Sequence, residues 1–170
     1  MNEFWQGEKA LRFITPPGER FPEGDIHGIL NNHCEGKVLE YGCGDGRLAP
    51  AFEVENYIGV DINPSAVEKA KRNNPEYDFR PVEFPGADTI LAHTVLLHVS
   101  DDRIEQLIGK FLEYPRIVIG EVMGRNWRRS GNPPVYNRDE QDYIDMMGRP
   151  VDIFHYPYPR YKCDFTILVC

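Results

Sequence analysis

The chain has 170 residues, which is close to the size of one domain with one core. Its composition, 41% hydrophobic and 27% charged, is that of a folded globular protein and excludes disorder as the main state. The 19 basic and 27 acidic side chains give a net charge of -8, which disfavours general binding of nucleic acid because such a chain repels a phosphate backbone.

The first 25 residues contain Pro16-Pro17-Gly18 and no regular hydrophobic period, so they are predicted to form a loop. Glu3 and Glu8 stand where a secretory signal would need an uninterrupted apolar core, and the chain has no apolar run of the roughly 20 residues that span a bilayer. We therefore expect a cytoplasmic protein that does not contact membranes. Trp5 could fold over a bound ligand as part of a lid or belong to the core, and the lid is favoured.

Apolar strand-like runs alternate with helical patterns along the rest of the chain, which is typical of a parallel sheet covered on both faces. Five short buried strands are expected, at 37–41, 56–61, 77–80, 88–93 and 116–122. Two further runs, 151–156 and 163–169, predict a hairpin with antiparallel pairing at one edge. The predicted fold class is α/β: a doubly wound, mostly parallel, seven-stranded Rossmann-like sheet with an antiparallel C-terminal hairpin.

Three helices have recognisable start signals. Asn63 can cap a helix after the second strand, and Ser100 can cap another after the fourth. Asn137 with Glu140 three residues later resembles a capping box, and this third helix should end at Gly148. The four cysteines lack Cys-x-x-Cys spacing, so reduced thiols and no metal site are expected.

The stretch with the clearest chemical meaning follows the first strand. Gly42, Gly44 and Gly46 alternate there, and three glycines in a turn let the backbone approach a ligand closely. Asp61 lies at the end of the next strand, where a carboxylate can accept hydrogen bonds from two ribose hydroxyls. Together these features predict a site for a cofactor that contains adenosine.

The residues around the glycines indicate which cofactor this is. A dinucleotide-binding loop would have a small residue in the sixth position of the motif, where this chain has Arg47. Glu40 and Asp45 add negative charge, which would repel a pyrophosphate but suits a ligand that carries an ammonium and a sulfonium. S-adenosylmethionine is such a ligand.

At these positions the sequence resembles the class I S-adenosylmethionine-dependent methyltransferases, as a small, single-domain member spanning 1–170. The resemblance covers about residues 25 to 122. The motifs that carry it are Glu40-Tyr41-Gly42-Cys43-Gly44-Asp45-Gly46, Gly59-Val60-Asp61, Asp88-Thr89-Ile90-Leu91 and Leu96-Leu97-His98-Val99.

The resemblance implies how the cofactor is held. Gly42 and Gly44 would pass under the methionine part, Glu40 would orient its amino group, and Asp61 would hold the ribose. Ala92 and His93, at the end of the fourth strand, would face the methionine and the reactive methyl. The whole cofactor-binding set that the resemblance implies is Glu40, Gly42, Cys43, Gly44, Asp61, Ile62, Val82, Glu83, Ala92 and His93.

The acceptor side is less defined by the sequence. If the reaction needs a general base, His93, Glu121 or Tyr143 could reach the pocket, although His93 and His98 could equally be structural histidines. In the acceptor-side loop 123–136, Arg125, Arg128 and Arg129 could bind an anionic group of the acceptor, with Trp127 as a stacking face, or the arginines could be solvated charges.

The predicted function is transfer of a methyl group from S-adenosylmethionine to an oxygen or nitrogen of a small molecule. The expected partner is that small-molecule acceptor, and the sequence leaves the oligomeric state open. Two alternatives stay open: a non-catalytic subunit that binds S-adenosylmethionine and needs a partner, and a nicotinamide-dependent oxidoreductase of the same fold class. Titration with each cofactor would discriminate the nicotinamide-dependent oxidoreductase from the other two.

Overall fold

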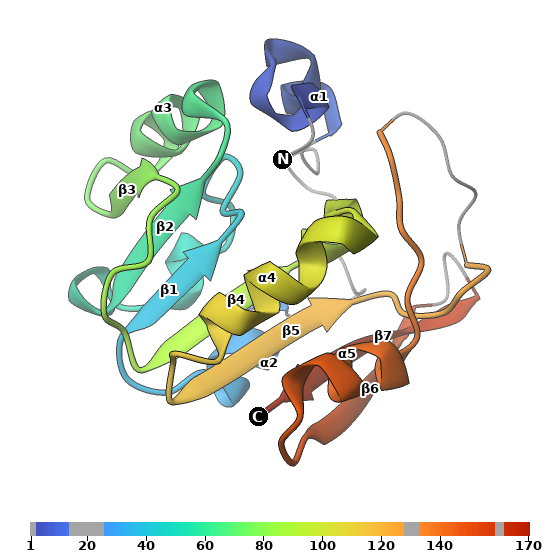
Figure 1. Cartoon of the computed structure of the whole chain (residues 1–170). Helices are drawn as coiled ribbons and strands as arrows, with labels where there is room; N and C mark the ends of the chain where they lie inside the picture. The colour runs from blue at the N-terminus through green and yellow to red at the C-terminus, as the bar shows by residue number, and fades with distance from the viewer. Residues whose placement is uncertain (1–2, 14–25, 128–132, 159–161) are drawn as a thin grey trace.

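The computed structural model describes residues 3–13, 26–127, 133–158 and 162–170 (Figure 1). One seven-stranded sheet runs through it, with the strand order β3-β2-β1-β4-β5-β7-β6. The strands are β1 (Val38–Tyr41), β2 (Tyr57–Asp61), β3 (Asp78–Pro81), β4 (Thr89–His93), β5 (Arg116–Glu121), β6 (Asp152–Tyr158) and β7 (Cys163–Val169). The first five pair in parallel, and β7 pairs antiparallel with both β5 and β6. The predicted fold class is confirmed.

Helices cover both faces of the sheet (Figure 1). Apolar residues of α2 (Ile26–His33) and α3 (Pro64–Asn73) belong to one core cluster, and those of α4 (Asp101–Phe111) and α5 (Glu140–Met147) to the other. Short 3-10 helices complete the described chain: η1 (Glu8–Phe13), η2 (Ala49–Ala51), η3 (Val54–Asn56) and η4 (Leu96–His98). None of the helices in the described ranges is both long and apolar enough to cross a membrane.

The helix starts follow the expected chemistry, with corrections. Asn63 caps α3, because its side-chain oxygen accepts hydrogen bonds from two backbone N–H groups of the first turn. Ser100 occupies the N-cap position of α4 without a side-chain cap bond. The capping box of α5 is formed by Asp139 and Asp142, whereas the amide of Asn137 donates to the carbonyl of Arg125.

The N-terminal segment departs from the expected loop. Residues 3–13 form α1 (Glu3–Gln6) followed by η1, and α1 lies beyond the edge toward which the parallel strands point (Figure 1). The amide of Asn63 donates to the carbonyl of Gly7 at 3.1 Å and ties this segment to the start of α3. The remainder of the predicted loop lies largely outside the described residues.

The strand order creates a crevice at one position. From β1 the chain proceeds outward through β2 and β3, then returns to the other side of β1 as β4. In open α/β sheets, ligands bind beyond the carboxyl ends of the strands where the order reverses in this way. The loops after β1 and β4 are therefore the expected walls of a binding site.

Candidate functional site

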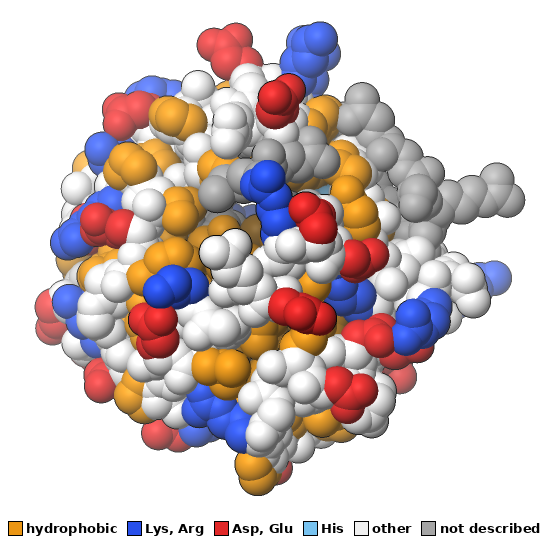
Figure 2. Space-filling view, viewed as in Figure 1, with side chains coloured by type: hydrophobic (Ala, Val, Ile, Leu, Met, Phe, Trp, Pro, Cys, Tyr) orange, Lys and Arg blue, Asp and Glu red, His pale blue; other side chains and the backbone are white. Residues whose placement is uncertain are grey.

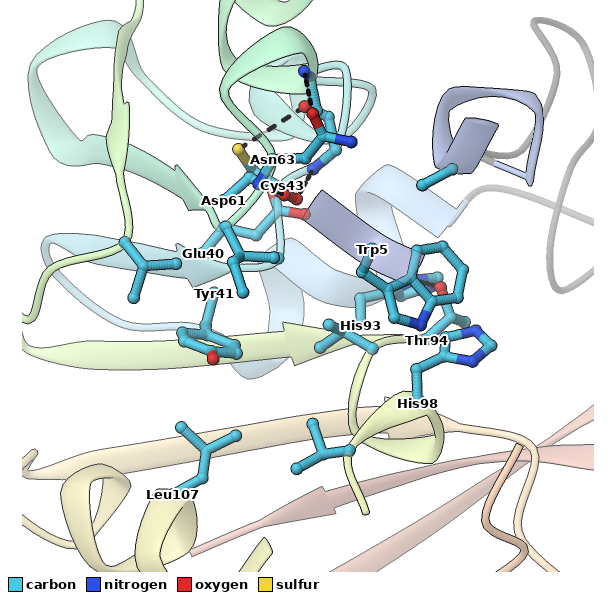
Figure 3. A pocket seen from close by; sticks show the side chains of 18 of the residues that line it. Trp5, Glu40, Tyr41, Cys43, Asp61, Asn63, His93, Thr94, His98 and Leu107 are labelled. Atoms are coloured by element: carbon cyan, nitrogen blue, oxygen red, sulfur yellow. Dashed lines mark hydrogen bonds between the residues drawn. The ribbon is translucent and has the colours of Figure 1, made fainter. Parts of the chain in front are cut away.

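A cavity of about 420 Å³ lies at the reversal point between β1 and β4, within the usual size range for small-ligand pockets of about 300–1,000 Å³ (Figure 3). Its walls come from the loops after β1, β2, β3 and β4, from α4, and from the N-terminal segment through Trp5 and Ala10. On the face of the molecule in Figure 2, basic and acidic side chains are interspersed rather than separated into single-sign areas. That face offers no continuous basic surface to a nucleic acid.

The glycine loop owes its shape to positive φ angles. Gly42, Gly44 and Gly46 have φ of 78°, 56° and 78°, a region that residues with a Cβ rarely adopt. A Cβ on Gly42 would also lie 2.4 Å from a methyl of Val95 in the loop after β4. Glycine at position 42 therefore lets the two loops that bound the cavity approach each other.

Asp61 joins two of the cavity loops. One carboxylate oxygen accepts from the N–H of Gly44 at 2.9 Å, and the other accepts from the N–H of Asn63 at 2.8 Å. Burial raises the pKa of Asp61, while these backbone donors act in the opposite direction. Each oxygen has more than one lone pair, so the carboxylate can still accept hydrogen bonds from a ligand in the cavity that it lines.

Glu40 is a buried carboxyl group on β1, just before the glycine loop. The hydroxyl of Tyr57 donates to it, and burial raises its pKa to about 7, opposed by that hydrogen bond and by the charge of Arg47. Gly59 makes this contact possible, since a Cβ there would lie 2.9 Å from the Tyr57 hydroxyl. Tyr57 is a site residue that was not predicted from the sequence, although its place two residues before Gly59 was a usable signal.

An apolar part of the cavity lies beside β3. Ile62 and Val82 line it as predicted, together with Phe84, whose ring stacks on that of Tyr41 at a centroid distance of 5.8 Å. Such a surface suits a flat, weakly polar group such as adenine. Glu83 does not line the cavity, and its carboxylate forms an exposed ion pair with Arg80 at 2.7 Å.

The two residues predicted at the end of β4 separate. Ala92 is fully buried in the core and does not line the cavity, whereas His93 does. Burial, followed by the charge of Arg47, lowers the pKa of His93 to about 3, so its imidazole is neutral at physiological pH. Thr94 follows with a φ of 55°, which is strained for a β-branched residue, and its N–H donates to the carbonyl of Gly120 at 2.8 Å.

The structure does not bring the other two candidate bases to the cavity. Glu121 and Tyr143 are each 1% exposed and bonded to one another, with the tyrosine hydroxyl donating at 2.9 Å. The second oxygen of Glu121 accepts from the N–H of Leu97 at 3.0 Å. Through this bond to Leu97, the pair holds the backbone of η4. Both side chains, Glu121 at the end of β5 and Tyr143 in α5, point into the core instead of the cavity.

The acceptor-side loop is only partly described. Trp127 packs against the hydrophobic core rather than lining the cavity, and Arg128 and Arg129 lie outside the described residues. Arg125 forms ion pairs with Asp139 at 2.8 Å and Asp142 at 2.6 Å. The positive charge of Arg125 is therefore neutralised by these two carboxylates at the start of α5.

Trp5 and His98 line the cavity, and their contacts could not be predicted from the sequence. The indole of Trp5 packs on the imidazole of His98 with ring centroids 4.3 Å apart (Figure 3). The Nδ1 atom of His98 lies 2.8 Å from the carbonyl oxygen of Pro134. No local sequence pattern signals these contacts, because they join segments that are far apart in the chain.

Comparisons with known proteins agree with this geometry. Residues 38–114 match the methyltransferase domain family. In Laribacter hongkongensis, ribosomal protein L11 methyltransferase is 28% identical over 134 residues, covering 72% of this chain and 42% of that protein. The counterpart in Pseudomonas aeruginosa is 30% identical over 87 residues, covering 45% and 30%. This chain thus spans less than half the length of these curated relatives.

Solved structures share the fold at low identity. Magnesium protoporphyrin IX methyltransferase from Synechocystis, with bound S-adenosylhomocysteine, superposes with a TM-score of 0.69 at 17% identity, covering 94% of this chain and 91% of that one. The [4+2]-cyclase SpnF also has a TM-score of 0.69, at 14% identity, covering 85% and 79%. The same fold therefore carries more than one chemistry.

The residues of the cavity fit S-adenosylmethionine. Carboxyl groups of Glu40 and Asp61 line one part of it, the glycine loop forms a wall in a conformation that residues with a Cβ rarely adopt, and apolar side chains line the part beside β3. Together with the match of residues 38–114 to the methyltransferase domain family, these features support a class I S-adenosylmethionine-dependent methyltransferase.

Proposed function

We propose that this protein transfers the methyl group of S-adenosylmethionine to an oxygen or nitrogen atom of a small molecule. The observation that carries the proposal is the position of the N-terminal segment. Trp5 and Ala10 line the same cavity as Glu40 and Asp61, so a ligand there is covered from the side away from the sheet. A covered cavity of this size favours a compact acceptor.

The side chains of this protein would act mainly by binding and alignment. Asp61 would accept hydrogen bonds from the ribose, Glu40 would face the amino group, and Ile62 with Val82 would contact the adenine. When bound, the cofactor supplies an electrophilic methyl group on a sulfonium, so alignment and exclusion of water can supply much of the acceleration. Trp5 would contribute to excluding water from the acceptor side.

A protein acceptor is the second candidate. The curated relatives are named for methylation of ribosomal protein L11, although the similarity covers less than half of their length. A protein substrate would have to insert a side chain beneath Trp5 or displace the N-terminal segment.

Calorimetry and product analysis test both candidates. We expect S-adenosylmethionine and S-adenosylhomocysteine to bind and NADH not to bind. Mass spectrometry would then measure S-adenosylhomocysteine formed with catechol, phenol, benzylamine and benzoate, and separately with purified ribosomal protein L11. Turnover of a small probe supports the proposal, while turnover of L11 alone supports the second candidate. Absence of cofactor binding contradicts both.

A further inference from the structure

His98 lies on η4, in the loop between β4 and α4, and lines the cavity. Its ring is partly buried beneath the indole of Trp5, across the cavity from Asp61 (Figure 3). His98 is thus on the side of the cavity that the ribose-binding carboxylate does not occupy. This is where a molecule that receives the methyl group would be expected.

The hydrogen bond from His98 to the backbone determines its tautomer. A carbonyl oxygen can only accept, so Nδ1, at 2.8 Å from the oxygen of Pro134, must carry a hydrogen. In a neutral imidazole the other nitrogen, Nε2, then carries the lone pair. Histidine bases are commonly oriented in this way, by an acceptor that holds the protonated nitrogen.

Several bonds fix the loop that carries His98. The N–H of Leu97 donates to the carboxylate of Glu121 at 3.0 Å, and the carbonyl of Leu97 accepts from the N–H of Tyr136 at 2.8 Å. The guanidinium of Arg138 donates to the carbonyl of Val99 at 2.7 Å. Since Arg138 is itself buried, these contacts hold the imidazole in a defined position before any ligand binds.

His93 is less suited to accept a proton. It is 4% exposed, and its ring packs against that of Phe165 at a centroid distance of 5.2 Å. With a pKa of about 3, the imidazole of His93 is neutral but only weakly basic. Proton transfer is most efficient when the base titrates near the working pH, and the pKa of His93 lies far below it.

We propose that His98 is the general base of this enzyme and that the acceptor atom is a hydroxyl oxygen. The inference rests on the methyl transfer proposed above. A phenol or alcohol keeps its proton at neutral pH, with a pKa of about 10 or more, whereas a carboxylate needs no base. As the acceptor oxygen forms its bond to the methyl carbon, the carbon–sulfur bond breaks with its electron pair left on sulfur. Nε2 of His98 takes the hydroxyl proton and later releases it to water.

Other titratable groups share the cavity, and they affect the charge of His98. Those on its described walls are Glu40, Tyr41, Cys43, Asp45, Arg47, Asp61, His93, Arg103 and Lys110. The acidic groups favour the imidazolium and the basic groups disfavour it. The protonation state of His98 must therefore be measured directly.

Nitrogen-15 NMR of the uniformly labelled protein makes that measurement, with His98 assigned from its absence in His98→Asn. The expected result at pH 7.5, with and without S-adenosylhomocysteine, is a neutral ring with hydrogen on Nδ1. A ring with hydrogen on Nε2, or one that stays doubly protonated up to pH 8.5, would overturn the proposal. This readout does not depend on activity.

Turnover provides the second test, with catechol and phenol as the hydroxyl probes. Asn at position 98 can keep an N–H donor for Pro134 but has no basic nitrogen. We expect His98→Asn to lower turnover by about 100-fold or more and to lose the rise of rate with pH, with the cofactor dissociation constant within about twofold of wild type. The control is His155→Gln, an exposed histidine on β6 that pairs with Glu140 and should change nothing.

The possible failures are distinct. If wild type does not bind S-adenosylmethionine, the proposed function itself fails. If the cofactor binds and His98→Asn turns over the hydroxyl probes as fast as wild type, His98 is not the base. Turnover of benzylamine or benzoate but neither hydroxyl probe, or of no probe, overturns the hydroxyl assignment.

Discussion

Two buried pairs of the same chemistry occupy different regions of the molecule. At the end of β1, Glu40 accepts a hydrogen bond from Tyr57, and at the end of β5, Glu121 accepts one from Tyr143. Both glutamates are almost fully buried, and burial raises the pKa of each to about 7. Only Glu40 lines the cavity, whereas Glu121 holds the backbone of η4. Burial and a shifted pKa therefore do not by themselves identify a residue that contacts ligand.

The comparison divides the site into two halves. We assign the cofactor to the half built from β1, β2 and the loops that follow them, where the bonds between Gly44 and Asp61 and between Tyr57 and Glu40 each span 17 residues. We assign the acceptor to the half built from Trp5, the loop after β4 and residues 134–138, which meet only in the folded chain. Substitutions in the two halves should therefore separate cofactor affinity from turnover.

Gly42→Val, where the loop after β1 meets Val95 of the loop after β4, should have the largest effect. The new valine would have to adopt a positive φ, which β-branched residues rarely do, and its side chain would overlap Val95. We therefore expect cofactor affinity to fall at least about 100-fold and the free energy of unfolding to fall as well. Calorimetry and urea unfolding measure the two effects. Gly109→Ala is the matched control: an added Cβ has open space there, and in a helix it should stabilise by about 0.5–1 kcal/mol. Normal cofactor binding by Gly42→Val would refute the described approach of the two loops.

The pH dependence of stability tests the two glutamates. Their carboxyl pKa rises from an ordinary 4.5 to about 7 on folding, so between those pH values the native state holds protons that the unfolded chain has released. Stability contributed by the protonated groups is present at pH 4.5 and is lost as the pH rises through 7. The free energy of unfolding should therefore decline between pH 5 and pH 8, as measured by urea unfolding. Glu40→Gln and Glu121→Gln should each reduce this decline by up to about 3 kcal/mol. A decline unchanged in both variants would show that neither carboxyl is held in its protonated form.

Asp61→Ala sharpens the definition of the cofactor half. Loss of hydrogen bonds to a charged group should weaken S-adenosylmethionine binding by about 1.5–3 kcal/mol, measured by calorimetry. Asp152→Ala, on the exposed edge strand β6, is the control and should bind normally. An unchanged dissociation constant in a folded Asp61→Ala protein would remove this carboxylate from the site.

The smallest expected effects come from the two tyrosine hydroxyls. Tyr57→Phe and Tyr143→Phe should each lower stability by about 1 kcal/mol, because one hydrogen bond to a buried carboxyl is lost. Tyr57→Phe should also weaken cofactor binding severalfold, and Tyr143→Phe should lower turnover without changing cofactor affinity. Equal effects of both variants on cofactor affinity would contradict the division into two halves.

The sequence was informative where structure is local. The strands and the cap at Asn63 depend on neighbouring residues, and the structure agrees with them. The bond between Gly44 and Asp61 spans 17 residues, but Gly44 follows β1 and Asp61 ends the adjacent parallel strand β2, so the two meet at one edge of the sheet. Glu83 does not line the cavity, and its carboxylate pairs with Arg80, a contact that depends on side-chain geometry. The contact of His98 with Pro134 spans 36 residues, and nothing in the local pattern of either segment specifies it.

Glu121 and Tyr143 illustrate a further limit. Their residue types are suited to acid–base chemistry, and on the sequence alone both are candidate bases that could reach the pocket. The structure instead turns both side chains inward, where each satisfies the other. Residue type and strand end define a candidate, but the direction of the side chain decides its role.

A crystal structure with S-adenosylhomocysteine would locate the cofactor itself. We expect the product in the cavity between β1 and β4, with its ribose hydroxyls on Asp61 and its adenine beside Ile62 and Val82. Trp5 and His98 should lie on the side of the sulfur away from the ribose. Product bound elsewhere, or bound with the ribose away from Asp61, would show that this cavity does not hold the cofactor as proposed.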